Sequence, residues 1–120
     1  MWHVLGNGLI LAGFGLMTWA MAVNRSFEVI VRIQTDRNHK VVKRGPYRYV
    51  RHPGYTGVIL AFYFGMPLAL GSLPAAFIAV VGLATMIVRT LLEDRTLQAE
   101  LPGYQAFTHE TRYRLIPGVL

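Results

Sequence analysis

The sequence predicts an all-α, integral membrane protein with about three transmembrane helices, two of which form a tight helical hairpin. Hydrophobic residues make up 53% of the 120-residue chain and charged residues only 15%, and two long segments contain no charged residue. A soluble domain of this size needs more polar surface than that. Because the length leaves room for one domain, we expect residues 1–120 to form a single membrane domain.

The first transmembrane helix is predicted at residues 4–23, which contain no charged side chain. Twenty residues at a rise of 1.5 Å each span about 30 Å, the thickness of the hydrocarbon core of a bilayer. A cleaved secretory signal is disfavoured because no basic residue precedes the apolar run. Small residues allow helices to approach closely in membranes, and this helix is rich in them: Gly6, Gly8, Gly13 and Gly15.

Residues 24–54 are predicted to form a basic cytoplasmic loop. They contain eight lysine and arginine residues against two acidic residues, whereas the segment from Arg89 to the end contains four of each kind. The excess positive charge therefore lies in one loop between hydrophobic segments, as the positive-inside rule expects of a cytoplasmic loop. Since this explains the basic character of the chain, nucleic-acid binding is not expected.

Residues 55–92 are predicted to form the helical hairpin. No charged residue occurs between positions 55 and 88, a stretch too long for one span and just long enough for two. The sequence Gly71-Ser72-Leu73-Pro74 supplies a turn, so we expect legs at 55–70 and 75–92. The two ends of a hairpin are neighbours, which should bring Tyr55 close to Glu93.

Residues 93–120 are predicted to form a cytoplasmic tail with helical character. The second leg should continue as a helix as far as Leu101, where Pro102-Gly103 breaks it. A second short helix is expected from Tyr104 to about Glu110.

Residues 45–55 are the candidate site. Pro46 and Pro53 cannot both lie inside one regular helix, so this aromatic and cationic segment must be a shaped loop at the mouth of a membrane span. His52 is suited to act as a general base or to hydrogen bond an anionic ligand, and equally to bond a backbone carbonyl. Arg51 is suited to a carboxylate or phosphate, although a topology-determining arginine is the commoner explanation.

Glu93 and Asp94 lie where the uncharged segment ends. One of them is placed to pair with Arg51 or Arg95, and the other to orient a polar ligand; a simple salt bridge at a helix end explains them equally well. No metal site is expected, because the chain has no cysteine and its four histidines contain no i,i+4 pair. Glycine-rich nucleotide motifs and a serine-nucleophile elbow are also absent from the sequence.

The site residues carry a family resemblance. Residues 45–57 resemble the G-P-Y-x-x-V-R-H-P-x-Y-x-G signature of the isoprenylcysteine carboxyl methyltransferase family, which includes relatives that methylate phospholipid amines. Its second half is similar to Glu93-Asp94, to Pro102-Gly103-Tyr104 and to residues 112–117, and residues 31–37 resemble the lead-in of bacterial members. Two departures occur: Asp94 replaces a second glutamate, and Phe107 stands where the family usually has tyrosine.

The resemblance implies an integral membrane methyltransferase that uses S-adenosylmethionine at the cytoplasmic face of, for a bacterial-type member, the inner membrane. Its acceptor would be lipid-like or hydrophobic, with a carboxylate or an amine, and would enter from the bilayer. The implied catalytic residues are Arg51, His52 and Glu93, with Arg51 and Glu93 orienting the acceptor. By position, the implied cofactor-binding residues are Gly45, Pro46, Tyr47, Val50, His52, Pro53, Tyr55, Glu93, Tyr104 and Arg114.

Two other functions remain open. Membrane sterol reductases share the R-H-P-x-Y and closing I-P motifs and bind NADPH, but that family tends toward tryptophan where this chain has Gly-Pro-Tyr. A non-catalytic membrane module that retains the fold is the third interpretation. Related enzymes generally have further transmembrane helices before this region, so the short chain leaves room for an oligomer, a partner subunit or a truncated form.

Overall fold

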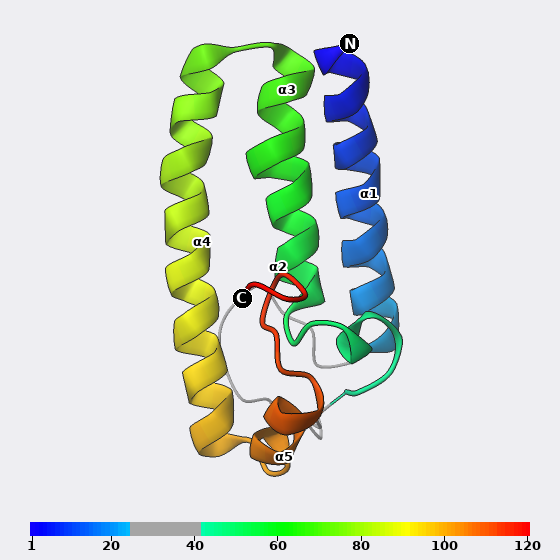
Figure 1. Cartoon of the computed structure of the whole chain (residues 1–120), viewed down its shortest axis with the longest axis vertical. Coiled ribbons are helices and arrows are strands. Elements are labelled where there is room, and N and C mark those ends of the chain that lie inside the picture. The colour runs from blue at the N-terminus through cyan, green and yellow to red at the C-terminus, as the bar shows by residue number, and fades with distance from the viewer. Residues whose placement is uncertain (25–41) are drawn as a thin grey trace.

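Three long helices lie side by side in a row in the computed structural model, which describes residues 1–24 and 42–120 (Figure 1). They are α1 (Trp2–Val23), a middle span over Pro53–Leu70, and α4 (Leu73–Glu100), and α1 and α4 lie on opposite sides of the middle span. All three are long and apolar enough to cross a membrane. The predicted all-helical architecture with three spans is therefore confirmed. Residues 31–37 and most of the expected basic loop lie outside the described residues.

The middle span consists of three helical pieces: α2 (Pro53–Val58), the π-helical segment η3 (Ile59–Gly65) and α3 (Met66–Leu70). Pro67 explains the irregularity, because it cannot donate a hydrogen bond to the carbonyl of Tyr63 and its ring would clash there. A π-helical turn just before the proline accommodates both effects. The span nevertheless continues to Leu70.

The hairpin turn lies where the sequence predicts it. Gly71 adopts a left-handed conformation (φ 62°) that ends α3, and Ser72 caps α4 by accepting a hydrogen bond from the backbone N–H of Ala75 at 3.2 Å. Both legs are longer than predicted. The first begins at Pro53 and the second already at Leu73, because proline is compatible with the first turn of a helix.

Two of the four glycines in α1 form its contact with the middle span. A Cβ atom at Gly6 would lie 2.6 Å from the carbonyl oxygen of Gly65, and one at Gly13 would lie 2.7 Å from the backbone nitrogen of Ala61. Gly8 and Gly15 have no neighbour within 4 Å of a Cβ position in the part of the chain that the structure describes. The close helix contact that the glycines indicate is therefore confirmed, and within the described residues Gly6 and Gly13 are the ones that form it.

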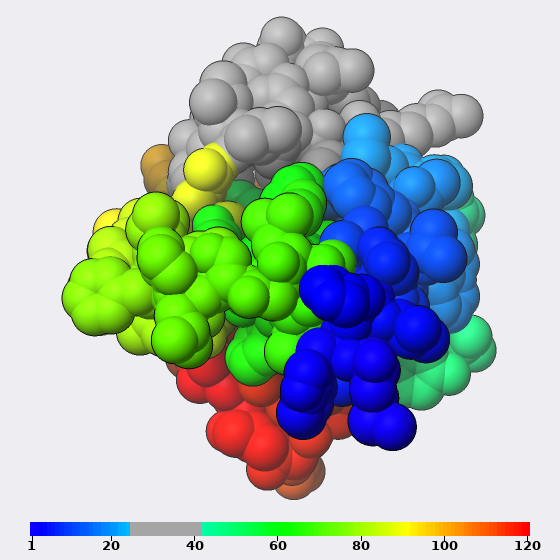
Figure 2. Space-filling model, turned by 90° about the horizontal axis from the view of Figure 1, so that it is seen from above, coloured from blue at the N-terminus to red at the C-terminus, as the bar shows by residue number. Residues whose placement is uncertain are grey.

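Short elements gather at the end of the bundle where α1 finishes. They are the 3-10 turn η2 (Gly45–Arg48), α5 (Tyr104–Glu110) and the C-terminal residues, which extend back along the bundle toward α2 (Figure 1). Viewed from the opposite end, the C-terminal residues lie on one flank of the row of spans (Figure 2). A buried cluster joins these elements to α1: Ala20, Tyr47, Leu101, Tyr104 and Phe107.

Candidate functional site

Residues 45–55 fold as two helix starts joined by a short connection. Pro46 lies in the first turn of η2 and Pro53 begins α2, so each proline occupies a position where its missing N–H costs little. Gly45 has a φ of 63°, which favours glycine. The predicted shaped loop is thus confirmed, and it places Arg51 and His52 immediately before a membrane span.

The backbone of this loop pairs with the C-terminal tail. The N–H of Arg51 donates to the carbonyl of Tyr113 at 2.8 Å, and the N–H of His52 donates to the carbonyl of Arg114 at 2.9 Å. The hydroxyl of Thr56 also donates to the carbonyl of Leu115 at 2.7 Å. These bonds fix the tail against the start of the middle span, so that side chains from both segments face α4.

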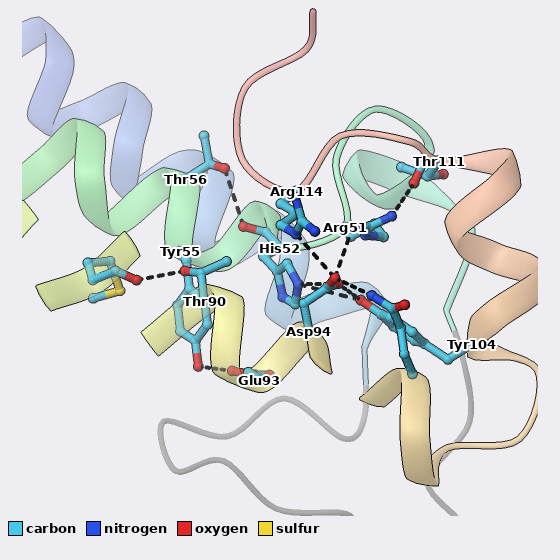
Figure 3. Close-up of polar contacts among 12 residues, drawn as sticks. Arg51, His52, Tyr55, Thr56, Thr90, Glu93, Asp94, Tyr104, Thr111 and Arg114 are labelled. Carbon is cyan, nitrogen blue, oxygen red and sulfur yellow. Dashed lines mark hydrogen bonds and ion pairs between the residues drawn. The ribbon is translucent and has the colours of Figure 1, made fainter. Parts of the chain in front are cut away.

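Asp94 on α4 is the centre of the site, where its carboxylate meets five polar side chains (Figure 3). The carboxylate is 1% exposed. Its partners come from the loop, from α4, from α5 and from the tail: Arg51 Nη2 (2.9 Å), His52 Nε2 (3.0 Å), Gln98 Nε2 (2.7 Å), Tyr104 Oη (2.8 Å) and Arg114 Nε (3.2 Å). We call these six residues the Asp94 hub.

The charges of the hub do not cancel. Arg51 and Arg114 both pair with the single carboxylate of Asp94, which leaves one surplus positive charge. The side chain of Arg51 is 5% exposed, whereas that of Arg114 is 34% exposed. The surplus charge is therefore accessible only through Arg114.

The tyrosines of the site remain neutral at physiological pH. Burial, followed by the negative charge of Asp94, raises the pKa of the Tyr104 hydroxyl far above its usual range. Burial also raises the pKa of Tyr47 to about 12, against a smaller lowering by the amide of Asn24, which donates to its hydroxyl oxygen at 2.9 Å. Tyr104 therefore acts in the hub as a neutral hydroxyl that donates to Asp94, and its oxygen also lies 3.4 Å from Nε2 of His52.

A second polar group lies beside the hub and does not join it. The hydroxyl of Tyr55 donates to the carboxylate of Glu93 (Figure 3), which confirms the expected closeness of the two hairpin ends. The rings of Tyr55 and His52 stack at 6.0 Å between centroids. The Tyr55 ring also contacts the guanidinium of Arg89, with the Arg89 Cζ atom 5.5 Å from the ring centroid.

The predicted site residues fall into three groups. His52, Tyr104 and Arg114 meet in the Asp94 hub, together with Arg51. Tyr55 and Glu93 form the second group. The remaining predicted positions lie in the packing of the loop, and all but the partly buried glycine are buried: Gly45, Pro46, Tyr47, Val50 and Pro53.

The structure adds contacts in the site that the sequence analysis did not predict, made by Asp94, Gln98 and Arg89. The sequence left open which acid pairs with Arg51, and the structure assigns that pairing to Asp94. Gln98 lies one helical turn after Asp94 and binds it; this i,i+4 spacing is a signal that could have been used. Arg89 was expected only to reach the membrane interface, but it lies against Tyr55.

Comparisons with known proteins agree with the motifs. A model of the phospholipid methyltransferase family matches residues 1–101. A probable protein-S-isoprenylcysteine O-methyltransferase of Oryza sativa subsp. indica is 37% identical over 62 residues, and protein-S-isoprenylcysteine O-methyltransferase A of Arabidopsis thaliana is 34% identical over 62 residues. Each match covers 49% of this chain and 32% of the relative. The chain thus spans about a third of the length of these relatives, and the resemblance predicted from the sequence is confirmed.

Proposed function

Because the chain belongs to the phospholipid methyltransferase family, we propose that it transfers a methyl group from S-adenosylmethionine to an acceptor with a hydrophobic tail. The acceptor atom is a carboxylate oxygen or an amine nitrogen, and the reaction takes place at the cytoplasmic face of a bacterial inner membrane. The observation that carries the proposal is the position of the Asp94 hub and the Tyr55–Glu93 pair. Both lie at one end of three apolar spans, where a polar cofactor and a bilayer-embedded acceptor can meet.

The exposed edge of the site suits this cofactor. S-adenosylmethionine carries a carboxylate, an ammonium group and a sulfonium. The guanidinium of Arg114 is accessible and carries the positive charge that Asp94 does not neutralise, so it is suited to bind the carboxylate. Glu93, partly buried beside the Tyr55 ring, is suited to the cationic groups. When bound, the cofactor supplies an electrophilic methyl group on its sulfonium.

The side chains then have to align the two reactants and keep water out. Methyl transfer is an in-line displacement, so that positioning provides much of the rate gain. A carboxylate acceptor would require no proton acceptor among the side chains, because it is already in its nucleophilic form. An amine acceptor must lose a proton, and Glu93 is the carboxylate placed to accept it. In either case, the buried pair of Arg51 and Asp94 holds the other side chains of the hub in place and does not touch the reactants.

We expect the protein in detergent to bind S-adenosylhomocysteine, and Glu93→Gln to weaken this binding by about tenfold or more, since a charged hydrogen-bonding partner is lost. Isothermal titration measures the affinity, and labelled methyl transfer to extracted lipids or to a prenylcysteine analogue measures activity. The matched control is Glu100→Gln, an exposed carboxylate near the end of the same helix.

Two results would contradict the proposal. Thermal stabilisation by NADPH but not by S-adenosylhomocysteine would indicate a reductase instead. Wild-type protein that binds neither cofactor would indicate a non-catalytic module that retains the fold.

A further inference from the structure

A cavity separate from the Asp94 hub lies between η2 and the C-terminal tail. Its volume is about 270 Å³, near the lower end of the range for small-molecule sites. It shares no residue with the hub, although Tyr113 lines the cavity and its neighbour Arg114 binds Asp94. We call it the outer pocket, and its lining residues all belong to the described part of the chain: Arg48, Tyr49, Glu110, Arg112, Tyr113 and Pro117.

The described residues that line the outer pocket carry a surplus of positive charge. Arg48 and Arg112 lie there against the single carboxylate of Glu110. Lys43 offsets the charge of Glu110, since its Nζ atom lies 3.3 Å from that carboxylate. Two guanidinium groups that open into one cavity favour an anion with several oxygens, such as a phosphate.

Both arginines are attached to backbone that the fold already fixes. The buried hydroxyl of Thr111 donates to the carbonyl of Tyr47 at 3.0 Å. Arg48 and Arg112 follow directly after these two residues along the chain. The guanidinium of Arg48 is further held by a 3.2 Å bond from its Nε atom to a carbonyl of η2 and by the ring of Tyr49, 5.6 Å from its Cζ atom. A ligand therefore meets a partly preorganised site and loses less affinity to side-chain ordering.

The tail beyond the outer pocket exposes apolar side chains. From Tyr113 the chain extends back along the bundle toward α2 (Figure 1), and Ile116 and Val119 on this stretch are 48% and 76% exposed. Tyr49 and Tyr113, at the pocket itself, are also exposed, and tyrosine is enriched at the headgroup level of membranes. Cations followed by apolar side chains along the spans match the order of phosphate and acyl chains in a phospholipid.

We infer that the outer pocket binds the phosphate of an anionic phospholipid, with Arg48 and Arg112 on the phosphate oxygens and the acyl chains along Ile116 and Val119. This lipid is not the methyl acceptor, because the pocket is separate from the hub, and the inference does not depend on the proposed methyl transfer. The bound lipid ties the loop and the tail, whose backbones pair with each other, to the membrane surface.

Isothermal titration of the whole chain in an uncharged detergent tests the inference with three probes. They are dihexanoyl phosphatidylglycerol, dihexanoylglycerol, which lacks the phosphate, and glycerol 3-phosphate, which lacks the acyl chains. None contains an amine or a carboxylate, so none serves as a methyl acceptor. We expect wild-type protein to bind the phosphatidylglycerol at least about tenfold tighter than either other probe.

Substitutions at the two arginines should remove this preference. Arg48→Gln and Arg112→Gln should each weaken phosphatidylglycerol binding by about tenfold, and the double variant should lose the preference. Arg112→Lys should retain part of it, since lysine keeps the charge without the planar fork. The matched control is Arg95→Gln, an exposed arginine on α4 outside the pocket, which should bind as wild type. Detergent-titrated unfolding checks that each variant is folded.

The inference is overturned if the double variant binds phosphatidylglycerol as tightly as wild type, or if wild-type protein binds either other probe as tightly as the lipid. Equal binding of glycerol 3-phosphate would indicate a site for a soluble phosphate. Binding of S-adenosylhomocysteine, measured on the same samples, should be unchanged in Arg48→Gln and Arg112→Gln. Its absence in wild-type protein would refute the proposed function and leave the lipid site standing.

Discussion

Asp94→Ala is expected to destabilise the protein by about 3–5 kcal/mol, because it leaves the guanidinium of Arg51 buried without a counter-ion. The same substitution removes the partner of Tyr104 and frees Arg114, so that the loop, α5 and the tail lose their common anchor. Unfolding of the purified protein in mixed micelles, titrated with denaturing detergent, measures the loss. S-adenosylhomocysteine binding should disappear with it.

Three further variants separate the charge of Asp94 from its shape. Asp94→Asn keeps the size and most of the hydrogen-bonding geometry but removes the charge, so we expect an intermediate loss. Asp94→Glu, which restores the acid more usual in the family at this position, should recover part of the stability. Glu100→Ala, an exposed carboxylate at the end of the same helix, should stay within about 0.5 kcal/mol of wild type. If Asp94→Ala loses no more stability than Glu100→Ala, Asp94 is not the common anchor of the loop, α5 and the tail.

Gly13→Val is expected to separate α1 from the middle span. A Cβ atom at Gly13 would meet the backbone nitrogen of Ala61 at 2.7 Å and its Cβ atom at 2.8 Å, and neither of these can rotate away. Overpacking of this kind costs about 1–3 kcal/mol and occasionally more; alanine should fall within this range and valine at or above its upper end. Detergent-titrated unfolding measures the cost, and cysteine crosslinking between the two helices reports their separation.

Gly15 provides the matched control for this experiment. It lies on the same helix two residues away, and nothing in the described parts of the chain approaches its Cβ position within 4 Å. Gly15→Ala should be neutral or slightly stabilising, since alanine favours helix, and Gly15→Val should cost far less than Gly13→Val. Equal losses at the two positions would mean that α1 does not pack against the middle span through its glycine face.

The spans were predictable because the bilayer imposes simple requirements on length and charge. Residues 4–23 and 55–88 lack charge over lengths that match one and two crossings, and Gly71 and Ser72 end one helix and cap the next. Which glycines meet a neighbour was not predictable. Composition records that glycines are present, but the rotation of α1 about its axis decides which of them face the middle span.

The site was predicted as a region and less well as a set of contacts. The resemblance indicated the loop, the acidic pair and the tail, and the structure brings these segments together. It did not distinguish the two acids, because adjacent residues on a helix point about 100° apart and sequence does not give the orientation of α4. Asp94 therefore faces the buried arginine while Glu93 faces Tyr55, and Arg89 turns toward the same ring.

The pairing of loop and tail has a consequence for how the protein is made. Arg51 and Asp94 are synthesised before Tyr104 and Arg114, yet Arg51, Tyr104 and Arg114 must all reach the carboxylate of Asp94. The packing of α1 against the middle span is direct and can form first, whereas Leu115 and Leu120 of the tail complete the apolar cluster between the middle span and α4. The site closes only when residue 114 has been synthesised and the tail has folded back along α2. Released chains truncated after residue 111 should insert in the membrane but lack the contact of Arg114 to Asp94.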